Sequence, residues 1–575
     1  MIFNTKKSFL TLSLILALAS LNAQNITTPP SYSYPLWLNE ASFYQIYPQS
    51  FKDTDGDGIG DIKGMIKKIP YVKSIGVNTV WLNPVFASSF NDAGYDVDDF
   101  YNVDPRYGTN DELKNFITKA HESGLRVCLD LVAGHTSKNN NWFKKSSKNE
   151  VNEFTDRYIW TNSKAIQPND FVLSFDSREG NYLKNFFDTQ PALNYGYANP
   201  NPLKPWEQLP TAPGPVATRE ALKDIIAYWM DMGADGFRVD MASSLIKNDP
   251  TFVETNKLWG NIRSWFSGKY PQGVLLAEWS NPEQAMNAGF MMDFMIHFNA
   301  KGYPSLFFED KNVVLKGTQA PFFSKQGGTI SEFLTSYLYQ KKQVGTKGLI
   351  ALPTANHDFQ RLNSGTRNSD DQLKVALAFL LTWPGVPYIY YGDEIGMKFI
   401  STMLPDKEGS VIPRNFVPYY ANRAGTRTPM QWDASKNAGF SDADITQLYL
   451  PQDPDLLNRP TVAKAEKDEF SVLNFTKTLL KLRQSAKALN NTGDLEILLG
   501  KDKIYPLIYK RTNGVDSYVI CLNPKNSGAH IQLKEKLMLK PILEQNMSID
   551  STEVTRNVFM EGVSFGIYKV IPRKK

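Results

Sequence analysis

Two carboxylates and an arginine at the ends of apolar segments are the residues of this sequence best suited to chemistry. Arg238 and Asp240 lie two positions apart in Gly-Phe-Arg-Val-Asp, so on a β-strand both side chains leave the same face. A neighbouring guanidinium favours the ionised carboxylate, which is the form that a nucleophile needs. Glu278 ends another apolar segment beside Trp279, and such surroundings tend to raise the pKa of a carboxyl group. The sequence therefore predicts one charged and one protonated carboxyl group.

Cleavage of a glycosidic bond with retained configuration requires this division of roles. One carboxylate attacks the sugar while a carboxylic acid protonates the leaving oxygen, and the two groups lie about 5 to 5.5 Å apart. Asp358, in Asn356-His357-Asp358, offers a third carboxylate that can bind sugar hydroxyls or stabilise oxocarbenium charge. Each motif alone also fits a buried ion pair. The three carboxylates together favour a glycosidase.

The segments that carry these residues belong to a repeating pattern of predicted strands and helices. Strand segments alternate with segments of helical period, which predicts a parallel sheet. The eight strand segments are Phe43–Tyr47, Val77–Val85, Arg126–Val132, Gly236–Met241, Val274–Trp279, Phe290–Phe298, Leu349–Pro353 and Val386–Tyr391. Eight such units close a (β/α)8 barrel, whose reactive side chains lie at the carboxyl ends of several strands.

The predicted fold class is α/β: a (β/α)8 TIM barrel with an inserted domain after strand three and a C-terminal antiparallel β-sandwich domain. The barrel is expected over residues 24–135 and 219–499. Residues 136–218 are polar, aromatic and Pro-rich, and are too many for a structureless connection, so they are expected to form the inserted domain over the barrel mouth. Residues 500–575 alternate apolar and polar positions between turn motifs, which predicts the C-terminal domain.

The N-terminal segment predicts the location of the protein, and the composition limits the classes of partner it can have. Lys6 and Lys7 precede an apolar run that is shorter than a membrane span, so residues 1–23 are expected to be a signal peptide. Export to a periplasm or out of the cell is expected, and a monomer is favoured. Lys and Arg number 63 against 59 Asp and Glu, with no basic stripe, which argues against a nucleic-acid partner. Cys128 and Cys521 are expected to be free and buried.

An acidic, glycine-rich segment follows the first predicted strand. It places carboxylates at every second position with glycines between them, a spacing typical of loops that bind hard cations. The expected Ca²⁺ ligands are Asp53, Asp55, Asp57, Ile59 and Asp61. An EF-hand is excluded because its twelfth position, a bidentate Glu, is here Gly64. The ion is expected to stabilise the loop rather than to take part in chemistry.

From about Pro35 to the C-terminus the sequence resembles the α-amylase superfamily, glycoside hydrolase family 13. The resemblance is carried by four segments: Asp130-Leu-Val-Ala-Gly-His135, Gly236-Phe-Arg-Val-Asp240, Leu276-Ala-Glu-Trp279 and Asn356-His-Asp358. It implies that Asp240 is the nucleophile, that Glu278 is the acid and then the base, and that Asp358 distorts the sugar in subsite −1. It also implies that His135 and His357 bind hydroxyls of that sugar and that Arg238 orients the nucleophile.

Two further segments resemble the α-glucosidase, oligo-1,6-glucosidase and trehalose synthase group. Asn91-Asp-Ala-Gly-Tyr-Asp96 implies that Tyr95 stacks on the glucose in subsite −1 and that Asp92 binds its far hydroxyls. Arg427-Thr-Pro-Met-Gln-Trp432 implies an arginine that pairs with Asp92 and closes the pocket. A closed pocket implies exo action on oligosaccharides. The calcium loop also matches this group.

Two departures from the family pattern leave alternatives open. Gly134 stands where the family usually has Asn before the first His, and Met241 follows the nucleophile at a position that influences linkage preference. The choice between α-1,4 and α-1,6 linkages therefore stays open. The expected activity is hydrolysis of short α-glucosides. The alternatives are a glucosyl transferase or isomerase of the trehalose-synthase type, an endo-acting amylase and a non-catalytic sugar-binding protein.

Overall fold

A computed structural model describes residues 33–572 except 296–301, 309–319, 401–403, 412–421, 502–504 and 550–553. The expected signal peptide lies outside the described residues. Among the helices of the described ranges, none has the length and apolar character needed to cross a membrane.

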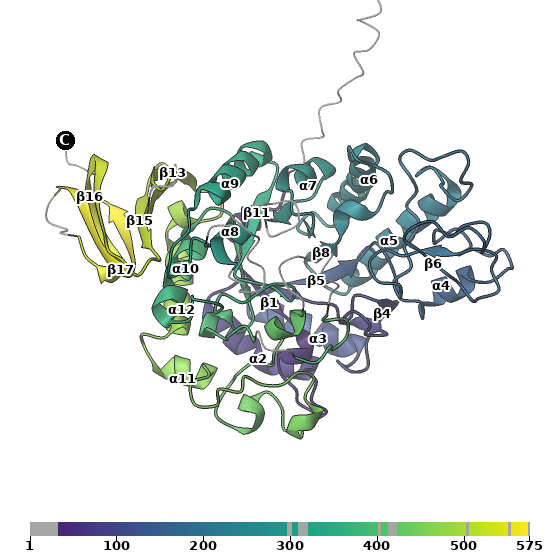
Figure 1. Ribbon diagram of the computed structural model, residues 1–575, viewed down its shortest axis with the longest axis horizontal. Helices are drawn as coiled ribbons and strands as arrows, with labels where there is room; N and C mark the ends of the chain where they lie inside the picture. The colour runs from purple at the N-terminus through teal and green to yellow at the C-terminus, as the bar shows by residue number, and fades with distance from the viewer. Residues whose placement is uncertain are drawn as a thin grey trace, which may run out of the picture. The chain divides into compact units, whose positions relative to one another are not determined.

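Eight parallel strands form a closed barrel in the order β1-β12-β11-β10-β9-β8-β5-β2. Among them, β1, β5, β8 and β11 are labelled in Figure 1. Pairing of β1 with β12 closes the barrel. Most residues of these strands are buried, because one face of each strand points into the barrel and the other face packs against the helices. The predicted barrel is confirmed, with strands β1 (Phe43–Ile46), β2 (Thr79–Leu82), β5 (Arg126–Val132), β8 (Gly236–Asp240), β9 (Val274–Ala277), β10 (Met292–Phe294), β11 (Leu349–Pro353) and β12 (Val386–Tyr390).

Helices alternate with these strands, and side chains cap the first two of them. Asp61 accepts a hydrogen bond from Gly64 at the start of the first, and Thr109 with Glu112 forms a capping box at the next. Their apolar faces join the barrel strands in one core cluster. The helices are α2 (Ile62–Ile75), α3 (Asn110–Glu122), α5 (Pro213–Asp231), α6 (Val253–Lys269), α7 (Pro282–Ala288), α8 (Pro304–Phe307), α9 (Ser331–Val344), α10 (Asp370–Thr382), α11 (Val462–Lys467) and α12 (Val472–Ser485).

The long connection after β5 carries little regular structure, namely α4 (Asn141–Ser146), β6 (Phe171–Val172) and β7 (Tyr182–Leu183). Aromatic packing holds it together: the ring of Phe143 lies 5.3 Å from Trp160 and 5.1 Å from Tyr182, between centroids. Backbone hydrogen bonds from Thr136 to Pro191 and from Leu193 to Gly134 join its last part to the segment after β5. The returning helix α5 begins at Pro213, inside the range predicted for this domain.

The C-terminal domain is an antiparallel sheet domain, as predicted. Its five strands have the order β13-β14-β15-β17-β16 and are β13 (Asp494–Leu499), β14 (Leu507–Thr512), β15 (Ser517–Asn523), β16 (Ala529–Met547) and β17 (Val554–Val570). Side chains alternate between its faces: Leu507 and Tyr509 join the barrel core, while Ile508 packs on the other side with Ile531 and Val558. The long β16 and β17 thus supply apolar cover for the face turned away from the barrel core. Cys128 and Cys521 are free and buried, as expected.

A further pair of short strands lies outside the barrel, after β2. The strands are β3 (Phe86–Ser88) and β4 (Val97–Val103), and they pair antiparallel. The turn between them carries Asp92 and Tyr95, two of the predicted sugar-binding residues. Asp96 holds this turn, because its carboxylate accepts hydrogen bonds from the backbone N–H groups of Asn91 and Asp92.

Candidate active site

The guanidinium of Arg238, on β8, lies at the centre of the site. Its Nη1 atom lies 2.8 Å from Asp130 and 3.0 Å from Asp240, and its Nη2 atom lies 2.8 Å from Glu278. The three carboxyl groups come from β5, from β8 and from the residue after β9. The buried guanidinium of Arg238 therefore forms ion pairs with carboxyl groups from three neighbouring strands. Because Asp240 and Glu278 contact two nitrogens of one guanidinium, they face the same point at the barrel mouth, as the retaining scheme requires.

The charge state of Asp240 differs from the sequence-based prediction that Arg238 keeps it ionised. Burial, followed by the nearby Glu278 carboxylate, raises the pKa of Asp240 well above its ordinary value, although Arg238 acts in the opposite direction. The prediction is wrong because Asp240 is buried and shares one guanidinium with two other carboxyl groups. The neighbouring Glu278 carboxylate thus adds to the effect of burial in favouring the protonated form of Asp240.

Backbone amides hold Glu278 and the loop that follows it. The N–H of Met241, which has a positive φ of 44°, donates to Oε2 of Glu278 at 2.9 Å. Asp293, on β10 and fully buried, then accepts hydrogen bonds from three successive backbone N–H groups, those of Trp279, Ser280 and Asn281. Sequence reasoning missed Asp293. Its sequence signal is a single carboxylate within the apolar segment Phe290–Phe298.

Asp358 follows β11 and has three cationic or polar partners. His357 Nε2 lies 3.2 Å from its carboxylate, Arg423 Nη1 lies 2.8 Å away and Arg427 Nη2 lies 3.3 Å away. Burial acts to raise the pKa of Asp358, but His357 and the two arginines together hold it well below its usual range. Asp358 is therefore ionised at neutral pH.

The ring of His357 is oriented by two side-chain amides. The Nε2 of Gln45 and the Nδ2 of Asn83 each lie 3.1 Å from Nδ1 of His357. Amide nitrogens donate, so Nδ1 accepts and the ring proton is on Nε2, facing Asp358. Tyr95 stacks on the ring of His357 at 5.3 Å and donates its hydroxyl to Asp130. The structure therefore brings the predicted Tyr95 and His357 together with the carboxylates.

Arg423, rather than Arg427, is the partner of Asp92. Arg423 Nη2 lies 2.8 Å from Asp92, while Arg427 Nε donates to the backbone oxygen of His357. The predicted Asp92–Arg427 pairing is therefore wrong, although Arg427 does reach the site through Asp358. Arg423 precedes Arg427 by four residues and begins the short 3-10 helix η5 (Arg423–Thr426). Which arginine reaches Asp92 depends on that turn, which the sequence does not specify.

Truncation of Arg423 is expected to remove the salt bridges that link Asp92 to Asp358. Arg423→Ala leaves the buried carboxylate of Asp92 and the partly buried carboxylate of Asp358 without their shared cation, and breaking a buried ion pair costs several kcal/mol. We expect kcat/KM on maltose to fall by about 100-fold, with a smaller fall on soluble starch. Arg219→Ala, which removes a surface arginine of α5, is the control. Equal losses on both substrates would contradict a role for Arg423 in closing the pocket.

One turn of the inserted domain supplies two amide side chains that sequence reasoning missed. Gln190 donates to Asp92 at 2.9 Å, and the side chain of Asn185 lies 2.9 Å from Nδ1 of His135. His135 is buried, and burial lowers its pKa to about 4, so the ring is neutral. No local motif marks Asn185 or Gln190. Both lie in an irregular loop some fifty residues beyond β5, and only the course of that loop brings them to the site.

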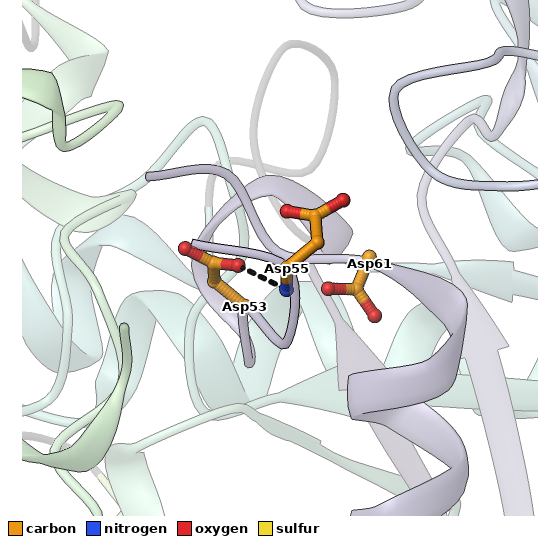
Figure 2. A group of neighbouring side chains, drawn as sticks. All are labelled: Asp53, Asp55 and Asp61. Carbon is orange, nitrogen blue, oxygen red and sulfur yellow. Dashed lines mark hydrogen bonds between the residues drawn. The ribbon is translucent and has the colours of Figure 1, made fainter. Parts of the chain in front are cut away.

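The acidic loop after β1 brings three of its carboxylates together. One carboxylate oxygen from each of Asp53, Asp55 and Asp61 lies within 4.8 Å of the others (Figure 2). Asp57 is not part of this group, and its carboxylate accepts a hydrogen bond from the N–H of Ile59 at 2.7 Å. Burial, and secondarily the neighbouring Asp53 and Asp61 charges, raise the pKa of Asp55. A cation among these oxygens would relieve that repulsion, so the donor set fits a hard metal ion.

Glycines allow the acidic loop to wrap tightly against the rest of the protein. Gly56 and Gly58 have φ values of 84° and 92°, in the left-handed region that favours glycine. A Cβ atom on Gly58 would lie 2.2 Å from the backbone oxygen of Gln447, so the loop also needs glycine for space. Asp61 ends the loop and caps α2, which links the acidic cluster to the first barrel helix.

A closed barrel of eight parallel strands with three carboxylates around one arginine at its mouth defines a glycoside hydrolase of the α-amylase type. Residues 45–492 match the alpha-amylase catalytic domain family. The chain belongs to this family, glycoside hydrolase family 13, and is an enzyme of that class.

Relatives along most of the chain fall into several activities. The chain is 31% identical over 539 residues to the salivary alpha-glucosidase of Aedes aegypti, covering 84% of this chain and 85% of the relative. It is 29% identical over 586 residues to the oligo-1,6-glucosidase of Parageobacillus thermoglucosidasius, covering 93% and 99%. It is 29% identical over 536 residues to a trehalose synthase/amylase of Mycobacterium tuberculosis, covering 85% and 82%.

Solved structures support the fold. The isomaltulose synthase of Erwinia rhapontici has a TM-score of 0.77 and 24% identity, with 94% of this chain and all of that chain covered. The trehalulose synthase of Pseudomonas mesoacidophila has a TM-score of 0.77 and 23% identity, with 93% and 99% covered. At this level of identity the likeness concerns the fold of the chain and not its activity.

Proposed function

We propose that this enzyme is an exo-acting α-glucosidase that hydrolyses short α-glucosides with retained configuration. The observation that carries the proposal is the pairing of Arg423 with both Asp92 and Asp358 at 2.8 Å. The salt bridge joins the β3–β4 turn to η5 and to Asp358, which supports a pocket closed at this end. A pocket closed in this way accepts the non-reducing end of an oligosaccharide.

The proposed reaction uses the carboxylates in two steps. Asp240 attacks the anomeric carbon and forms a covalent β-glucosyl ester, while Glu278 gives its proton to the leaving glycosidic oxygen. Glu278 then removes a proton from water, which attacks the same carbon from the opposite side and releases α-glucose. Arg238 fixes the relative position of the two carboxyl groups, and Asp358, held ionised, binds hydroxyls of the sugar and favours its distorted form.

A product profile tests the proposed activity. We expect maltose or isomaltose to yield glucose, with the α-anomer appearing first in a proton NMR time course, and soluble starch to lose viscosity slowly. Trehalose and sucrose complete the substrate set. A rapid loss of starch viscosity would indicate endo action, and β-glucose as the first product would exclude retention. Either result would overturn the proposal.

A glucosyl transferase or isomerase of the trehalose-synthase type is the second candidate. It is favoured by the relative named trehalose synthase/amylase, which matches the chain over 85% of its length. Water and a sugar hydroxyl compete for the same covalent intermediate, and the outcome depends on how well the site excludes water. Formation of trehalose from maltose, in place of free glucose, would establish this candidate.

We propose that Ca²⁺ binds the acidic loop through Asp53, Asp55 and Asp61, with Asp57 and the backbone oxygen of Ile59 as further ligands. Removal of Ca²⁺ with a chelator is expected to lower the melting temperature by several degrees, because ligand binding to the folded state adds stability. Restored Ca²⁺ should reverse the loss. Asp55→Asn should shrink the shift, and Asp176→Asn, outside the loop, is the control. An unchanged melting temperature would exclude a structural ion.

We also propose that the protein is exported through a signal peptide of residues 1–23. The order of two lysines, an apolar run and small residues in that segment supports this location. N-terminal sequencing of the mature protein checks the proposal, with Gln24 as the expected first residue. A mature protein that keeps Met1 would contradict export by cleavage.

A further inference from the structure

The space beside the α-carbon of Gly134 is filled by a side chain from the inserted domain. A Cβ atom on Gly134 would lie 2.9 Å from Nδ2 of Asn185 and 3.4 Å from Leu245. The first distance is shorter than real Cβ contacts, so any other residue at position 134 would displace the amide. Gly134 has no positive φ. Glycine at this position is therefore explained by the space that the side chain of Asn185 occupies, and not by backbone conformation.

The hydrogen bonds of Asn185 have a defined direction. Burial lowers the pKa of Lys247 to about 8, so at neutral pH its ammonium group can only donate, and its Nζ lies 3.2 Å from Oδ1 of Asn185. The amide nitrogen of Asn185 therefore faces Nδ1 of His135 at 2.9 Å, and this ring nitrogen accepts. The ring proton then lies on Nε2, which donates to the backbone oxygen of Tyr95 at 2.9 Å.

The same side chain is connected to other parts of the site. Nδ2 of Asn185 lies 3.7 Å from the sulfur of Met241, whose N–H contacts Glu278. The backbone N–H of Asn185 donates to the oxygen of Gln190, whose side chain binds Asp92. One turn of the inserted domain thus orients groups on two sides of the pocket.

We propose that Asn185 is a positioning residue that, together with the backbone oxygen of Tyr95, holds the ring of His135, and that glycine at position 134 is what admits it. Its effect on catalysis rests on the proposed function, because His135 acts through the backbone of Tyr95, which it holds beside the carboxylates. The hydrogen bonds of the ring do not themselves depend on that function. The two parts can therefore be tested separately.

Nitrogen-15 NMR of histidine in the full-length enzyme at neutral pH tests the orientation directly, without substrate. The His135 signals are assigned by their loss in His135→Gln. We expect a neutral ring protonated on Nε2 in the native protein. In Asn185→Ala the oxygen of Tyr95 still accepts from Nε2, so the tautomer should stay and the Nδ1 signal should shift to that of an acceptor without its hydrogen bond. In Asn185→Asp, a side chain of the same size accepts where the amide donated, while the oxygen of Tyr95 still accepts from Nε2, so the ring should gain a second proton on Nδ1 and become imidazolium.

Kinetics test the link to Gly134. We expect Asn185→Ala to lower kcat/KM on the best substrate by about 10- to 100-fold, the range typical of lost positioning contacts. Gly134→Ala should cause a similar loss because its methyl group displaces Asn185. In the double variant the loss should exceed that of Asn185→Ala by less than about twofold, since the amide is already gone.

Asn199→Ala, which removes an exposed amide elsewhere in the inserted domain, is the matched control and should leave the spectra and kcat/KM unchanged. Losses that multiply in the double variant would overturn the role of Gly134. Unchanged His135 signals in both Asn185 variants would overturn the whole proposal, whatever the activity. Changed signals in a protein that cleaves no α-glucoside would instead contradict the proposed function alone.

Discussion

Asp240→Ala should lower kcat/KM on α-glucosides by about four orders of magnitude or more. The variant removes the group that forms the covalent intermediate, and losses of this size follow removal of a nucleophile. Asp240 contacts Arg238 at 3.0 Å, so the variant also removes one of the three carboxyl partners of that guanidinium. The contacts of Arg238 with Asp130 and Glu278 remain. Steady-state kinetics on maltose and on an aryl α-glucoside measure the loss. Asp188→Ala, which removes an exposed carboxylate of the inserted domain, should leave both rates unchanged.

The product formed with azide identifies what Asp240 does. In Asp240→Ala a small anion can enter the space of the lost carboxylate and attack the anomeric carbon directly, from the side opposite the leaving group. Glu278 remains to protonate that group, so the expected product is β-glucosyl azide, identified by NMR. An Asp240→Ala enzyme that keeps its rate would contradict the assignment of the nucleophile. An α-glucosyl azide from this variant would show that another residue attacks the sugar.

The barrel and its carboxylates could be predicted because their signals are local. Eight short apolar segments alternate with helical ones, and this pattern is set by burial on both faces of a parallel sheet. Once the strands are placed, Asp240, Glu278 and Asp358 are expected at one rim, since all parallel strands of a barrel end there. The contact of Arg238 with Asp240 agrees with this geometry, and the contact with Glu278 adds to it.

Contacts made by loops could not be predicted in the same way. Gln190 meets Asp92 across 98 positions of sequence, and Arg423 meets it across 331. These pairings depend on the path of irregular segments, for which no periodic pattern exists. A motif can mark a loop as functional, as it did for the loop of Arg427. Which side chain of that loop reaches Asp92 depends on the conformation of the short helix η5.

The charge state of the site could not be read from neighbouring residues alone. In the sequence Arg238 stands beside Asp240, which favours an ionised carboxylate. In the fold the same guanidinium also binds Asp130 and Glu278, and Arg238, Asp130 and Asp240 are buried. Burial and the second carboxylate then outweigh the attraction and raise the pKa of Asp240. Arrival of a sugar whose anomeric carbon gains positive charge would favour the ionised nucleophile again.

Glu278→Ala should slow the enzyme in a way that depends on the leaving group. On maltose, whose leaving sugar must be protonated, we expect kcat/KM to fall by about 10²- to 10⁴-fold, the usual contribution of general acid catalysis. On dinitrophenyl α-glucoside the leaving group departs without a proton, so kcat/KM should fall far less. Glu278→Gln keeps an acceptor for the N–H of Met241 and should show the same contrast. Equal losses on both substrates would remove Glu278 as the acid.

Azide separates the second role of Glu278 from the first. Without a base, water attacks the covalent intermediate slowly, so the dinitrophenyl substrate should give a burst followed by a slow steady state. Azide needs no base and can use the space left in Glu278→Ala, so it should raise the steady-state rate. Because it attacks the β-glucosyl ester on Asp240, the product should be α-glucosyl azide. The two alanine variants are thus expected to give opposite anomers of the same azide, since the two carboxyl groups act from opposite faces of one sugar ring.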